Sequence, residues 1–180
     1  DAGGGIQNNA ISFIGGDNFL TLSAGFSLSG DINVVGGGSL TFAQPVDAIL
    51  ANVITGTSPI LKTGVGTLTL SGVNTYTGGT TILEGIIQVD NSTPGVSSSV
   101  GTGPVTLDGG TFQSIVTGLD FVNAFVVGGS GGTIDNAGGF GDTLTISGQI
   151  TGTGPLTVAS SGFFATTIFN NGNNTYSGGT

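Results

Sequence analysis

The chain has 180 residues, of which 37 are glycine and only 6% are charged, and its formal net charge of −9 includes one cation, Lys62. One cation cannot neutralise a run of phosphates, so this balance excludes a nucleic-acid partner and argues against an anionic membrane surface. Cysteine and histidine are absent and no apolar run reaches the roughly 18 residues of a transmembrane helix, so we expect no disulfide, no metal or other cofactor and no direct membrane insertion.

Short alternating segments begin near residue 10. AISFIGG (10–16) alternates weakly, and residues 19–42 alternate clearly between apolar and polar side chains. Period-2 alternation bounded by Gly, Ser, Asp and Asn predicts short strands separated by turns. AQPVDAILANVI (43–54) is the one stretch with some helical character, and we favour strand or loop for it.

The same pattern continues to the end of the chain. GTLTLSG (66–72) predicts a strand, NTYTGGTT (74–81) a turn, and TILEGIIQV (81–89) two strands around a glycine kink. Strands are also predicted in 104–115 and 143–158, and the apolar segment 119–129 is expected to be buried on both sides. The predicted inward residues are Leu20, Leu22, Leu40, Phe42, Leu68, Leu70, Val105, Leu107, Leu144 and Ile146.

Two stretches of the chain repeat one another. ITGTSP (54–59) returns as ITGTGP (150–155), 96 residues later, and NTYTGGT (74–80) returns as NTYSGGT (174–180), 100 residues later. The second copy therefore holds four extra residues between its two anchors. No helix of ordinary length fits, so a sandwich, a barrel or a solenoid remain. An internal repeat, many glycines for stacked corners and few charges favour the solenoid.

The segment LKTGVGTLTLSGVNTYTGGTTILEGIIQV (61–89) resembles the autotransporter passenger-associated β-strand repeat, and VGTGPVTLDGGTFQ (100–113) is similar to the segment that commonly follows it. The resemblance implies a right-handed parallel β-helix exported to the surface of Gram-negative bacteria, usually ahead of an outer-membrane β-barrel. We therefore predict that residues 1–180 form one β-helix segment of six to nine coils, with repeat copies at 54–89 and 150–180, within a longer chain.

Few residues suggest chemistry. Lys62 could act as a base, but its place in the repeat explains it. Glu84, Asp90 and Asp108 could approach one another on successive coils as a glycosidase-type carboxylate pair, and we favour solvated loop carboxylates instead. GGFGD (138–142) is similar to a calcium-binding nonapeptide, but Asp142 stands one position early, so we favour a plain turn.

Aromatic and amide side chains recur in the repeat. Asn74, Asn174 and Asn91 are expected to form side-chain ladders between coils. Tyr76 and Tyr176 occupy the same repeat position. For these two tyrosines, a turn packed against its neighbour is favoured, and the alternative is an exposed aromatic that contacts a ligand.

These observations predict a non-enzymatic, structural or adhesive module at the bacterial surface, with no catalytic residues. Its expected partners are neighbouring β-helix coils or further copies of itself, and host or environmental surface glycans through Tyr76 and Tyr176. Two alternatives remain open: a subunit of an extracellular filament stacked end to end, and an enzyme or binding module that acts on polysaccharides.

Overall fold

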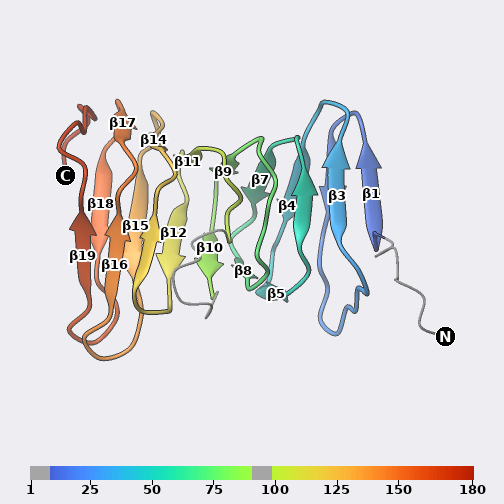
Figure 1. Ribbon diagram of the computed structural model, residues 1–180, viewed down its shortest axis with the longest axis horizontal. Helices are drawn as coiled ribbons and strands as arrows, with labels where there is room; N and C mark the ends of the chain where they lie inside the picture. Colours follow the sequence, from blue (N-terminus) through green and yellow to red (C-terminus); the bar gives the residue numbers. More distant parts are fainter. Residues whose placement is uncertain (1–8, 91–98) are drawn as a thin grey trace.

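The computed structural model describes residues 9–90 and 99–180, and over these residues all regular structure is β-strand (Figure 1). All strand pairs are parallel and join strands of successive coils, as in the pairs Ile60 with Thr80 and Thr80 with Val105. The strands stack side by side from β1 to β19 along the long axis of the molecule. The fold is a β-solenoid of about seven turns, which confirms the predicted parallel β-helix.

The coils have three faces. The seven-stranded face contains β2 (Asn18–Leu20), β4 (Leu40–Ala43), β7 (Ile60–Thr63), β9 (Thr80–Ile82), β11 (Val105–Leu107), β14 (Phe125–Val127) and β17 (Ile150–Gly152). The six-stranded face contains β5 (Ala48–Leu50), β8 (Thr67–Leu70), β10 (Ile86–Val89), β12 (Thr111–Ser114), β15 (Gly132–Asn136) and β18 (Leu156–Ala159). The third face has two short sheets: β1 (Ile11–Ile14), β3 (Ile32–Val35) and β6 (Ile54–Gly56), then β13 (Leu119–Phe121), β16 (Thr143–Ile146) and β19 (Thr166–Phe169).

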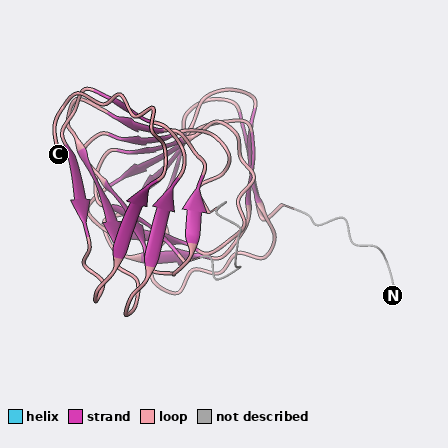
Figure 2. Cartoon of the chain, turned by 60° about the vertical axis from the view of Figure 1, so that its left-hand side comes forward, coloured by secondary structure: helices cyan, strands magenta, loops and turns pink. Residues whose placement is uncertain are grey.

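The three faces enclose one apolar interior (Figure 2). Nine of the ten residues predicted to point inward are buried, because alternate residues of each strand face the inside of the coil. Leu20 is half-buried and packs against the core, because β2 is the edge strand of its sheet. Aromatic rings fill the centre, where Phe112 makes edge-to-face contacts with Phe121 and Phe125 at centroid distances of 4.9 and 5.3 Å.

Two sequence-based expectations about single segments have opposite outcomes. Residues 43–54 form strand and loop as predicted, with β5 at 48–50 and β6 beginning at Ile54. Segment 119–129 is not buried on both sides: Phe121 is buried but Val122 is 77% exposed. A solenoid sheet has one face toward the core and one toward solvent, so even an apolar strand presents every second side chain to water.

The two repeat copies have the same local structure but lie on different faces. In the first copy, Thr75 and Thr77 donate their N–H groups to Ile54 and Gly56 of β6 on the third face. In the second, Thr175 and Ser177 make the equivalent bonds to β17, on the seven-stranded face. The following strands are displaced likewise, from the seven-stranded face for β7 to the six-stranded face for β18. The second copy has therefore advanced by one face around the coil.

Candidate binding surfaces

Tyr76 lies at a corner that the next coil covers completely. Its side chain is fully buried, its hydroxyl is 2.6 Å from Thr80 Oγ1, and Gly101 packs against its ring. Burial raises the pKa of the Tyr76 phenol well above its usual value. The alternative in which Tyr76 is an exposed ligand contact is wrong, because the stacked coil leaves the ring no contact with solvent.

Tyr176 repeats this corner with less cover. Its hydroxyl is 2.6 Å from Thr180 Oγ1, the same contact as in the first copy, but the side chain is only half-buried. The proposed role of Tyr176 in contacting a ligand stays a prediction.

The asparagines of the two corners bind backbone groups of neighbouring coils. Asn74 Oδ1 accepts from Ile54 N at 2.7 Å, and its amide donates to Ser99 O at 2.5 Å. Asn174 Oδ1 accepts from Ile150 N at 2.8 Å. Because these corners lie on different faces, the predicted amide-to-amide ladder of Asn74 and Asn174 is wrong. Asn91 lies outside the described residues.

A side-chain ladder that the sequence analysis missed runs across the solvent side of the six-stranded face. Thr69 Oγ1 donates to Gln88 at 2.9 Å, Gln88 donates to Gln113 at 2.6 Å, and Gln113 donates to Asp135 at 2.8 Å. The Asp135 carboxylate also accepts from the Ser161 N–H and hydroxyl, at 3.0 and 2.7 Å. Burial acts to raise the pKa of Asp135, but the hydrogen bonds from Gln113 and Ser161 together outweigh it and hold the pKa below its usual value. The ladder links strands of four coils and the loop after β18.

Lys62, the only cation of the chain, is buried inside a corner. Its ammonium donates to the carbonyl oxygens of Thr63, Gly64 and Glu84 at 3.0, 2.6 and 3.2 Å. Burial lowers the pKa of Lys62 to about 8, against the opposing attraction of Glu84 and Asp47. These contacts show that Lys62 is a structural hydrogen-bond donor that joins two coils.

The pKa of Lys62 predicts a rise in stability at alkaline pH. In the unfolded chain the Lys62 ammonium keeps its proton up to about pH 10.5, whereas in the folded chain it releases the proton near pH 8. Because the unfolded chain binds more protons in this range, the free energy of unfolding should increase by about 1–2 kcal/mol between pH 8 and pH 10.5. Above about pH 10 it should fall, because unfolded tyrosines ionise while buried Tyr76 resists. Urea titrations followed by circular dichroism would measure both trends, and Lys62→Met should remove the rise. An unchanged stability from pH 7 to 9.5 would contradict the assignment.

The candidate catalytic carboxylates Glu84 and Asp108 accept hydrogen bonds from backbone N–H groups. Glu84 Oε2 accepts from Gly64 N at 3.0 Å, and Asp108 Oδ1 accepts from Ser130 N at 2.8 Å. The hydrogen bonds from Ser130 lower the pKa of Asp108. Since β9 pairs with β11, Glu84 and Asp108 lie at one corner in successive coils, whereas Asp90 follows the opposite end of β10. The structure therefore does not bring all three together.

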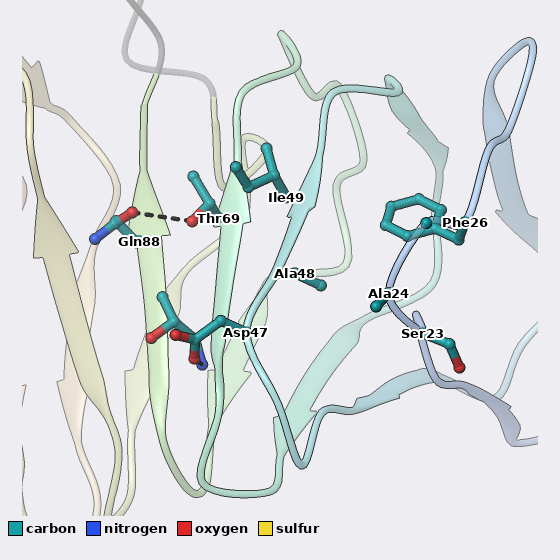
Figure 3. Close-up of a pocket in the computed structure, with 10 residues that line it drawn as sticks. Ser23, Ala24, Phe26, Asp47, Ala48, Ile49, Thr69 and Gln88 are labelled. Carbon is teal, nitrogen blue, oxygen red and sulfur yellow. Dashed lines mark hydrogen bonds between the residues drawn. The ribbon is translucent and has the colours of Figure 1, made fainter.

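A hollow of about 530 Å³ opens on the six-stranded face (Figure 3). It forms because residues 21–31 contain no strand, which leaves β5 at the edge of its sheet beside the loop that carries Phe26. The lining mixes apolar and polar groups and holds one carboxylate and no cation: Ser23, Ala24, Gly25, Phe26, Asp47, Ala48, Ile49, Thr67, Thr69 and Gln88. Such a lining suits an uncharged polar ligand.

The segment GGFGD forms a turn, with Asp142 N donating to Gly139 O at 3.3 Å. Within residues 9–90 and 99–180, no cluster of three or more acidic side chains is placed to hold a metal ion. Over the same residues there is no helix of the length and apolar character needed to cross a membrane.

Stacked parallel strands, repeated asparagine–tyrosine corners and one apolar interior define a parallel β-helix. Residues 60–89 match the family model of the passenger-associated-transport-repeat, so the chain carries the repeat that its sequence resembles. Over 167 residues the chain is 35% identical to the "Adhesin BmaC autotransporter" of Brucella suis biovar 1 (strain 1330). That alignment covers 90% of this chain but only 5% of the adhesin. No solved structure matches the chain.

Proposed function

We propose that this chain is an adhesive, non-enzymatic segment of the extracellular passenger of a bacterial autotransporter-like surface protein. The observation that carries the proposal is the similarity of nine tenths of the chain to part of an autotransporter adhesin, together with the transport-associated repeat at 60–89. A stack of hydrogen-bonded coils is a rigid spacer, and its outward side chains offer an extended contact surface.

Beads coated with the purified chain test the adhesive role. They should bind cultured epithelial cells more than beads coated with an unrelated acidic protein, and free chain should compete. Equal binding of the two bead types would reject adhesion. An epitope tag at Gly129, where the backbone is exposed, should be cleaved by protease added to intact bacteria if the segment lies at the cell surface.

The enzyme alternative makes a contrasting prediction. Because Glu84 and Asp108 each accept a backbone hydrogen bond at a corner, we expect no release of reducing sugar from neutral or acidic polysaccharides. A reducing-end assay should give the same background for the parent chain, Glu84→Gln and Asp108→Asn. Hydrolysis that either substitution abolishes would establish a polysaccharide-cleaving enzyme instead.

A further inference from the structure

Three phenylalanine rings form an exposed aromatic cluster near one end of the stack. Phe140, Phe163 and Phe164 are 77, 71 and 72% exposed. Phe140 and Phe163 are inclined by only 26° at a centroid distance of 6.1 Å, whereas Phe164 stands at 69° and 86° to them, at 5.2 Å from each. Large apolar side chains gathered in water mark interaction sites.

The cluster is carried by two loops that are held firmly. Residues 137–142 join β15 to β16 and residues 160–165 join β18 to β19. The loops are tied to each other by Gly141 N, which donates to Phe163 O at 2.9 Å. Buried residues anchor their bases: Asp135 accepts two hydrogen bonds from Ser161, and Asn136 O accepts from Gly162 N. A surface fixed before binding loses less conformational entropy when it meets a ligand.

The second repeat copy departs from the first at this cluster. Three residues, 64–66, join β7 to β8, whereas six join β18 to β19. Three of the four extra residues in the second copy thus belong to the loop that carries Phe163 and Phe164. Phe164 also has a φ of 57°, which is unfavourable for a bulky side chain and is typically retained at functional sites.

We propose that the aromatic cluster binds neutral carbohydrate chains, a ligand class that rests on the proposed adhesive function. The three exposed rings present aromatic faces and edges in two orientations, because Phe140 and Phe163 are inclined by only 26° and Phe164 stands at 69° and 86° to them. The negative faces of the rings attract the polarised C–H groups of a pyranose face. Gly139 and Gly141, on either side of Phe140, are exposed and carry no side chain, which leaves room for the sugar hydroxyls beside the rings. Anionic glycans are disfavoured, because Asp142 lies on the same loop and the only cation, Lys62, is buried elsewhere.

Affinity electrophoresis tests the ligand class. The chain is run through gels containing dextran, galactomannan or hydroxyethylcellulose, with alginate as the anionic comparison. We expect retardation in at least one neutral gel and none in alginate. The double variant Phe140→Ala/Phe163→Ala should raise the apparent dissociation constant at least tenfold. Phe19→Ala is the matched control, because Phe19 is 72% exposed on β2 at the other end of the stack, and it should migrate like the parent chain.

The inference would be overturned by no retardation in any neutral gel or by equal retardation of the double variant and the parent chain. It would also be overturned if sedimentation showed that the parent chain self-associates and the double variant does not, while both bind glycan equally.

The bead assay separates the two proposals. Adhesion retained by a double variant that has no glycan affinity would reject only the role of the cluster. Glycan binding without adhesion of the parent chain would reject only the adhesive function.

Discussion

Replacing Gly148 with alanine is expected to lower the free energy of unfolding by about 3 kcal/mol or more. Gly148 follows β16, and a Cβ at this position would overlap the carbonyl oxygen of Asn123 in the preceding coil. The backbone at Asn123 is fixed between coils, because the Asn123 amide donates to the carbonyl oxygens of Gly101 and Gly103 and the Gly148 N–H donates to Phe121 O. Relief would therefore require the coils to separate. Overpacking costs about 1–3 kcal/mol where side chains can adjust, and here the obstacle is main chain.

Gly129→Ala is the matched control for this substitution. Gly129 also lies in a corner between strands, but apart from its chain neighbours no atom lies within 4 Å of the position that an added Cβ would occupy. It should therefore unfold within about 0.5 kcal/mol of the parent chain. Urea titrations followed by circular dichroism would compare the two variants. Equal stability of Gly148→Ala and the parent chain would show that the coils are stacked more loosely than described.

The two repeat tyrosines should respond very differently to truncation. Tyr76→Ala is expected to cost about 3–5 kcal/mol, because it empties a fully buried ring site that the next coil cannot collapse to fill. Tyr176→Ala should cost about 1 kcal/mol or less, since Tyr176 is half-buried. The sequence around the two residues is nearly the same, so the contrast isolates the effect of burial.

Conservative variants separate the ring from its hydroxyl. Tyr76→Phe should cost only about 1 kcal/mol, because Thr80 Oγ1 keeps its hydrogen bond to Val100 O at 3.1 Å. The same denaturant series would measure it.

If Tyr176→Ala were as destabilising as Tyr76→Ala, the burial difference would not govern the response. If it left stability unchanged but weakened binding to neutral polysaccharides, Tyr176 would be a ligand contact as predicted.

The sequence was sufficient to predict strands and their inward residues, because period-2 alternation is local: Leu68 and Leu70 can be assigned without knowing their neighbours. The side-chain ladder required knowledge of which residues face one another across coils. Successive members are separated by 19, 25 and 22 residues, so no fixed period aligns Thr69, Gln88, Gln113 and Asp135.

The candidate sites were harder to predict for the same reason. A carboxylate such as Asp108 looks available for catalysis until the Ser130 N–H of the next coil is placed against it. The aromatic cluster unites Phe140 with Phe163 across two loops, whereas the sequence shows only two separate Gly-Phe pairs. Tyr76 and Tyr176 are equivalent in the repeat, and only the burial of their side chains distinguishes them.

The displacement of the second repeat copy by one face indicates that the repeating structural unit of this chain is one face of a coil with its corner, rather than a whole turn. Each side of the triangular cross-section offers the same parallel edge and the same inward alternation, so a strand–corner unit can join any of them. Adding or losing one side between two copies leaves their stacking intact but swivels everything downstream by a third of a turn. The connection β7–β8 and its counterpart β18–β19 therefore open at different corners. Such a scaffold can point a recognition loop in a different direction around the solenoid axis without altering the loop itself.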